Sequence, residues 1–112
     1  MKAYLIDPSQ TGSLIITEID FSGDWKDISP TIGDHCRAFD VVTLYHVDDY
    51  DFVDDHVYVD DEGLYSVDDQ YFWMHKHYPL PLAGRGLVLG GDSEGNSTDV
   101  ATDIETLRND IR

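Results

Sequence analysis

The tripeptide Val-Asp-Asp occurs four times between residues 47 and 69, and this repeat constrains the fold more than any other feature. Between Arg37 and Lys76 every charged residue is acidic. Aspartate is favoured in turns, where its side chain accepts hydrogen bonds from nearby backbone N–H groups. We therefore expect turns at the doublets, with their carboxylates exposed and gathered on a folded body.

The acidity does not indicate a disordered chain. Hydrophobic residues make up 41% of the sequence and aromatic residues 12%, whereas disordered acidic tails lack aromatic residues. A chain of 112 residues has the length of one domain. At that length it buries roughly two thirds of its unfolded surface. We expect a single domain over residues 1–112 with one hydrophobic core.

The charge balance limits the partners of this domain. The chain carries 23 acidic and 7 basic side chains, a formal net charge of -16. Such a surface repels phosphates, which argues against direct binding to DNA, RNA or an anionic membrane. It favours a basic protein, multivalent cations or a salty environment. The oligomeric state does not follow from the sequence.

Cysteine usage and hydropathy bear on location. Cys36 is the one cysteine, so the sequence predicts no intrachain disulfide. The apolar run at residues 3–6 is too short for a signal peptide or a membrane span. We expect a cytosolic protein.

Residues 3–19 predict a β-hairpin. Residues 3–7 and 14–19 are rich in apolar and β-branched side chains, and residues 8–13 between them have the composition of a turn. We therefore expect two antiparallel strands joined by a longer loop.

The next segment predicts one short helix. Trp25, Ile28 and Ile32 recur at helical spacing. Pro30 conflicts with one smooth helix because it lacks an N–H and clashes with the preceding turn. We expect a turn and then a short helix, with Ser29 as its N-cap and Pro30 in its first position.

Four more segments have the composition of strands, namely residues 38–47, 56–59, 64–67 and 87–89. The first of them is expected to be buried on both faces near its middle. Residues 48–51 and 60–63 suit turns, the latter of type I with Asp first and Gly last. Residues 71–74 form a dense apolar patch that is typical of a core.

The C-terminal segment predicts an amphipathic helix. Its apolar residues recur at intervals of four, three and four, at Val100, Ile104, Leu107 and Ile111. We expect Ser97 or Thr98 to cap this helix. Together these elements predict an α+β fold: an antiparallel sheet with an N-terminal β-hairpin, one short central helix and a C-terminal amphipathic helix.

The Val-Asp-Asp series predicts a surface that binds a basic partner. One DNA strand carries a charge every 3.4 Å along its axis, and one face of a β-strand carries a side chain roughly every 6.6 Å. Adjacent strands and turns can therefore match the charge density of a nucleic acid. The expected acidic carriers are Asp48, Asp49, Asp51, Asp54, Asp55, Asp60, Asp61, Glu62, Asp68 and Asp69. The expected aromatic anchors are Tyr50, Phe52 and Tyr58.

Metal sites and catalytic sites have weaker support. Asp49, Asp51, Asp54 and Asp55 suit loose Ca²⁺ association, but an EF-hand register from Asp49 lacks the required glycine and final glutamate. The alternating pair His75 and His77 lacks the further ligands of a closed zinc site. No known nucleophile motif is present. We expect no enzymatic activity, no cofactor and no dedicated metal.

Three blocks of the chain resemble a group of small uncharacterised proteins from bacteriophages. The blocks are residues 4–8 (Tyr-Leu-Ile-Asp-Pro), 58–64 (Tyr-Val-Asp-Asp-Glu-Gly-Leu) and 79–90 (Pro-Leu-Pro-Leu-Ala-Gly-Arg-Gly-Leu-Val-Leu-Gly), with Glu94-Gly95 after them. The last two blocks also resemble a broader domain-of-unknown-function family of phages and plasmids. The resemblance implies a phage origin and, by analogy, an inhibitor of a host or defence protein in the host cytosol. It supplies no catalytic or binding residues.

Two alternatives remain open at this stage. The first is a protein that sequesters a small molecule or nucleotide, with Arg85, Lys76 and the glycine-rich loops at its pocket and an acidic face that only keeps it soluble. The second is adaptation to a salty cytoplasm, which predicts acidic residues scattered over all faces.

Overall fold

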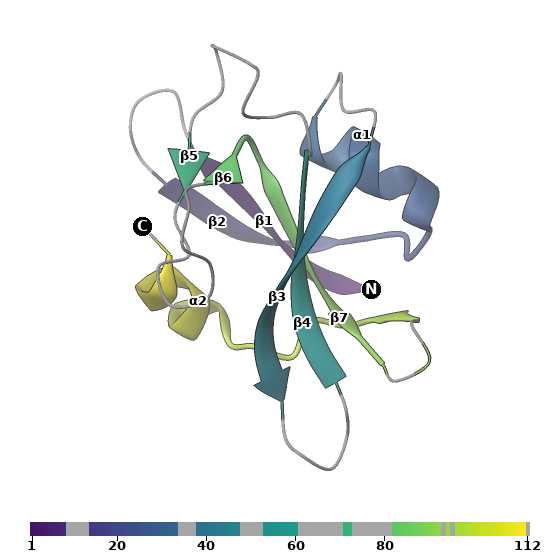
Figure 1. Ribbon diagram of the computed structural model, residues 1–112. Helices are drawn as coiled ribbons and strands as arrows, with labels where there is room; N and C mark the ends of the chain where they lie inside the picture. Colours follow the sequence, from purple (N-terminus) through teal and green to yellow (C-terminus); the bar gives the residue numbers. More distant parts are fainter. Residues whose placement is uncertain are drawn as a thin grey trace.

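An antiparallel β-sheet organises the chain in the computed structural model (Figure 1). The structure describes residues 1–8, 14–33, 38–47, 53–60, 71–72, 82–92, 94 and 96–111. The sheet has the strand order β2-β1-β7-β4-β3, and β8 pairs with the end of β7. Its strands are β1 (Lys2–Pro8), β2 (Leu14–Asp20), β3 (Phe39–Val47), β4 (Val53–Asp60), β7 (Gly86–Gly91) and β8 (Ser97–Thr98). A separate ladder joins β5 (Tyr71–Phe72) to β6 (Leu82–Ala83).

The strand β7 lies at the centre of the sheet. It pairs with β4 along one side, and with β1 and then β8 along the other. Leu87, Val88 and Leu89 are all fully buried. A strand that is covered on both faces has a continuous apolar sequence rather than an alternating one. This explains why the short run Leu-Val-Leu between glycines forms the middle of the sheet.

Two hydrophobic clusters cover the two faces of the sheet. On one face, Val88 packs with Phe72 and with the apolar side of the helix α2 (Ile104–Asp110). On the other face, Leu87 and Leu89 pack against the helix α1 (Ile28–Ile32). Figure 1 shows α1 on one side of the sheet and α2 with β5 and β6 on the other. The predicted α+β fold is confirmed, with a layer on each face of the antiparallel sheet.

The predicted N-terminal hairpin is also confirmed. β1 and β2 pair in antiparallel register from Lys2 with Asp20 to Pro8 with Leu14. Ala3, Tyr4 and Ile6 are buried, because both faces of β1 lie under a cluster. The predicted strands at residues 38–47, 56–59 and 87–89 correspond to β3, β4 and β7. The predictions for residues 48–51 and 64–67 lie outside the described residues, as do residues 61–63 of the predicted turn at 60–63.

The central helix differs from the prediction at its start. A 3-10 turn, η1 (Trp25–Asp27), leads directly into α1, and the Asp24 carboxylate caps η1 by accepting a hydrogen bond of 3.0 Å from the Lys26 amide. Ser29 is therefore not the N-cap, because it already lies within α1. Pro30 still fits, since amides of a first helical turn have no intrahelical partner. Trp25 does not join the buried stripe and is 68% exposed.

The C-terminal helix begins later than predicted. Its N-cap is Asp103, whose carboxylate accepts hydrogen bonds from the amides of Glu105 (3.1 Å) and Thr106 (3.4 Å). Ser97 and Thr98 form β8 instead of capping the helix. Val100 is buried with Leu107 and Ile111 although it precedes the helix, and Ile104 packs against them partly buried. None of the described helices is long and apolar enough to span a membrane.

Two glycines allow close packing against β7. A Cβ atom at Gly90 would overlap the backbone carbonyl oxygen of Asp99 and the hydroxyl of Thr98. A Cβ atom at Gly86 would lie 2.9 Å from the ring of Phe72 and 3.1 Å from Val57. At Gly90 the obstacle to a methyl group includes backbone, whereas at Gly86 it consists of side chains. A side chain can rotate away from a new methyl group, but a backbone segment cannot.

We predict that Gly90→Ala destabilises the protein more than Gly86→Ala does. Overpacking of this kind costs about 1–3 kcal/mol, and the higher value is expected where the obstacle is backbone. Urea unfolding of both variants measures the difference in the free energy of unfolding. Equal stability of the two variants would contradict the close approach of Asp99 to β7.

Candidate functional site

Most of the predicted acidic surface lies outside the described residues. This holds for Asp48, Asp49, Tyr50, Asp51, Phe52, Asp61, Glu62, Asp68 and Asp69. Asp54 belongs to β4, but its side chain is also outside the described part. Three of the predicted site residues are described with their side chains: Asp55, Tyr58 and Asp60. All three come from β4, the strand next to the centre of the sheet.

Asp55 is not an exposed carrier of charge, and that prediction is wrong. Its side chain is fully buried on the face of the sheet that α2 covers. The reason is that this copy of Val-Asp-Asp lies in a strand and not in a turn. Successive residues of a strand point to opposite faces, so a doublet within a strand cannot present both carboxylates on one outer wall.

The Asp55 carboxylate instead holds the segment that leads into α2. One oxygen accepts a hydrogen bond of 3.1 Å from the Ala101 amide. The other accepts one of 2.8 Å from the Thr102 amide and another from the Thr102 hydroxyl. The Thr102 carbonyl in turn accepts a hydrogen bond of 2.8 Å from the buried Tyr4 hydroxyl. A buried carboxylate is tolerable only when its oxygens are satisfied in this way.

We predict that Asp55→Ala lowers the free energy of unfolding by about 3 kcal/mol, because it leaves the buried donors of Thr102 and the part-buried amide of Ala101 without their acceptor. Asp40→Ala is the matched control, since Asp40 is an exposed aspartate on the neighbouring strand β3. Both variants remove one carboxyl group. If urea unfolding shows equal effects for the two variants, the structural role of Asp55 is excluded.

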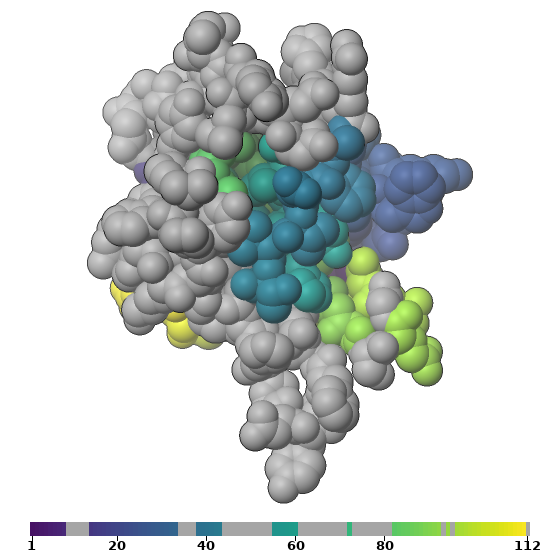
Figure 2. All heavy atoms as spheres, in the orientation of Figure 1, coloured from purple at the N-terminus to yellow at the C-terminus, as the bar shows by residue number. Residues whose placement is uncertain are grey.

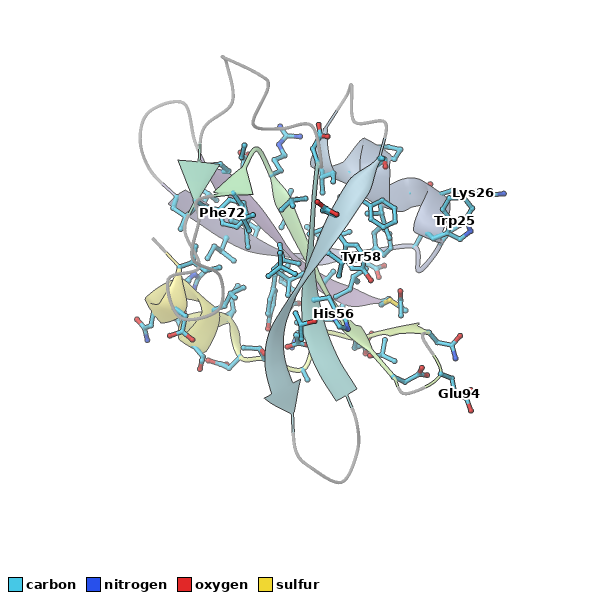
Figure 3. The ribbon with its side chains drawn as sticks, in the orientation of Figure 1. Trp25, Lys26, His56, Tyr58, Phe72 and Glu94 are labelled. Atoms are coloured by element: carbon cyan, nitrogen blue, oxygen red, sulfur yellow. The ribbon has the colours of Figure 1, made fainter. Side chains whose placement is uncertain are left out.

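Tyr58 and Asp60 lie on the opposite face of β4 from Asp55, on the side of α1. Asp60 is partly exposed and lies opposite Phe39 in the ladder with β3. The Tyr58 ring meets the Phe39 ring edge-on, with centroids 5.3 Å apart. Figure 3 shows Tyr58 and Phe72 on opposite sides of the sheet. Tyr58, which was predicted as an aromatic anchor, is therefore only partly exposed.

Burial raises the pKa of Tyr58 above the ordinary value of 10.0, and a side-chain hydrogen bond with Ser97 offsets part of this rise. Because the folded protein holds the proton more tightly than the unfolded chain, this contribution to stability is fully present below pH 10.0. It is lost as the pH rises through the folded pKa.

We predict that one tyrosine of the folded protein ionises at a higher pH than an ordinary exposed tyrosine, and that Tyr58→Phe removes this late step. Absorbance at the tyrosinate band during an alkaline titration measures it. Tyr4→Phe is unsuitable as a control because the Tyr4 hydroxyl supports Thr102. If Tyr58→Phe instead removes an ordinary step and leaves a late step in place, the buried environment of this ring is ruled out.

A partly apolar surface on β3 and β4 was missed by sequence reasoning. We call it the β3 face; its residues are Phe39, Val41, Thr43, His56 and Tyr58. Val41 lies opposite Tyr58 and is 48% exposed, and the Thr43 hydroxyl lies 3.3 Å from Nδ1 of His56. The prediction of burial on both faces near the middle of this strand is therefore wrong. The alternation of residues 39–43 was visible in the sequence, but it does not tell which face stays open.

The described cations are largely engaged already. The amino group of Met1 lies 2.7 Å from the Asp20 carboxylate, which raises the pKa of that amino group and lowers the pKa of Asp20, mainly through the hydrogen bond between them. Other ion pairs join Lys2 to Glu18 (3.8 Å), Arg85 to Asp7 (3.7 Å) and Arg108 to Glu105. All of these are solvent-exposed to some degree, so they contribute little to stability.

The features that favoured a nucleotide pocket have other roles where the structure describes them. Arg85 lies beside Asp7, and Gly86 and Gly90 make room for Phe72 and for the Asp99 backbone. Gly84 has a φ of 78°, which suits the tight turn between β6 and β7. Lys76 lies outside the described residues. Within the described ranges, no three His, Cys, Asp or Glu side chains gather closely enough to hold a metal ion.

Comparisons with known proteins add no assignment. No family model, no curated protein and no solved structure matches this chain.

Proposed function

We propose that this protein binds and inhibits a basic, nucleic-acid-binding protein by presenting a carboxylate-rich surface in place of a nucleic acid. The observation that carries this proposal is the excess of 23 acidic over 7 basic side chains on a folded domain. A partner that holds phosphates with Arg and Lys can hold carboxylates through the same charge-assisted hydrogen bonds.

The arrangement of the described cations supports this proposal. Lys2, Arg85 and Arg108 each lie beside one carboxylate, so they are not available to neutralise the Val-Asp-Asp series. With 7 basic side chains in all, one-to-one pairing leaves 16 of the 23 acidic side chains without a basic side chain of their own. An external cation is therefore needed to neutralise them, and a basic protein surface provides many at once.

The packing of the sheet supports the same proposal. A hydrophobic cluster lies on each face of the sheet, and the strands β3 and β4 that flank the first acidic doublet are paired along their length. Acidic segments attached to such a frame lose less freedom on binding than a disordered tail would. The host or defence protein as target, and the cytosol of an infected cell as location, follow from the resemblance to phage proteins.

We predict that a partner captured from bacterial lysate by the immobilised protein is released by salt and by DNA. Affinity should fall roughly tenfold or more between about 50 mM and about 200 mM salt, because the contacts are ionic. Double-stranded DNA should compete with the protein for that partner. A complex that withstands salt, or one to which DNA and this protein bind together, would refute nucleic-acid mimicry.

Substitution of the acidic doublets tests which carboxylates are used. Asp48→Asn with Asp49→Asn should weaken binding to the captured partner more than Glu18→Gln with Glu105→Gln does. The control pair removes the same charge from exposed positions on β2 and α2. Equal losses of affinity in the two double variants would mean that binding depends on net charge alone and not on the position of the doublets.

A further inference from the structure

The two edges of the sheet differ in how they are protected. At the β2 edge, α2 lies alongside, and the Arg108 guanidinium donates a hydrogen bond of 3.2 Å to the backbone carbonyl of Ile16. At the other edge, β3 pairs with β4 alone among the described strands. Exposed edges offer unpaired backbone N–H and C=O groups to another chain, and proteins usually cover or charge them.

The first half of β3 is open to solvent. Val41 is 48% exposed, and Asp40 and Thr43 are also exposed. Figure 2 shows this part of the chain uncovered in the middle of the visible face. Between Phe39 and Thr43 the strand carries one charged residue, Asp40, so charge does little to block it. The register with β4 is regular there and shifts only between Thr43 and Tyr45.

The chemistry of the occupant follows from charge. A second copy of this chain would bring another net charge of -16 to the same edge, which opposes self-pairing. A segment rich in Lys or Arg is attracted instead, and the exposed Asp40 carboxylate lies on the edge strand itself. The β3 face offers apolar contact for alternate side chains of such a segment, at Val41 and the Phe39–Tyr58 pair.

We propose that the outer edge of β3 captures an extended, Lys- or Arg-bearing segment of the partner as an additional antiparallel or parallel strand. Backbone hydrogen bonds would then supply affinity, and the β3 face would supply specificity, as in other cases of strand addition. This proposal rests on the proposed function, because it locates part of the same partner interface.

Val41→Lys and Ile15→Lys form a matched pair that tests this proposal. Val41 and Ile15 are both 48% exposed, lie at opposite edges of the sheet, and undergo the same change in charge. The probe is a labelled ten-residue peptide of alternating Lys and Val, with binding measured by fluorescence anisotropy. We expect Val41→Lys to weaken binding roughly tenfold more than Ile15→Lys does.

A second measurement separates strand addition from simple charge attraction. The same peptide with alternate backbone nitrogens methylated keeps its charge but loses hydrogen-bond donors, and it should bind markedly less well. Hydrogen exchange should show added protection at residues 39–43 and none at residues 14–20. Both lysine variants must retain the wild-type amide spectrum, which shows that they are folded.

The outcomes distinguish this proposal from the proposed function. Equal losses in the two lysine variants, equal binding of the methylated peptide, or no binding of the peptide would overturn capture at the β3 edge. A dimer of the protein paired through β3 in sedimentation experiments would overturn it as well. Salt-sensitive, DNA-competed binding of the partner would still support the proposed function in each case, and its loss would refute that function separately.

Discussion

The burial of β7 on both faces is the constraint on which the rest of the structure depends. β7 pairs with β4 on one side and with β1 and β8 on the other, so the N-terminal hairpin and the β3–β4 pair share a single strand. Its apolar side chains belong to both hydrophobic clusters, which ties α1 and α2 to the same few residues. The glycines at its ends permit this crowding, because neighbouring backbone and rings come closer there than a Cβ atom would allow.

A buried carboxylate helps to hold α2 against the sheet, although most charged side chains of this chain are acidic. Asp55 receives three hydrogen bonds from Ala101 and Thr102 and so fixes the approach to α2. The same chain uses carboxylates at Asp24 and Asp103 to begin its helical segments. Some aspartates of this protein therefore stabilise local structure through hydrogen bonds, and others contribute exposed surface charge. The net charge alone does not show to which group a given aspartate belongs.

The sequence predicted the elements better than their ends. The hairpin, the strands β3, β4 and β7 and the apolar stripe through Leu107 all follow from periodicity, which reports burial directly. The start of α2 does not follow from periodicity, because Ser97, Thr98 and Asp103 are all good N-cap residues. The pairing of β8 with β7 places Ser97 and Thr98 in a strand and leaves Asp103 as the cap. The burial of Asp55 was also beyond sequence reasoning, because its Val-Asp-Asp copy is identical in sequence to the others and nothing in the tripeptide shows that it lies within β4.

The solvent exposure of the β3 face was also not predicted from the sequence. The alternating pattern shows that Phe39, Val41 and Thr43 share one face of the strand. It does not show how far α1 extends over that face and buries these side chains. The shift in register between Thr43 and Tyr45 then has a consequence of its own. A bulge bends a strand and increases its twist, so the flat, continuous template that successive copies need for stacking is interrupted after Thr43. Among the described strands, β3 therefore offers regular geometry for one added strand over residues 39–43 and loses it where the register shifts.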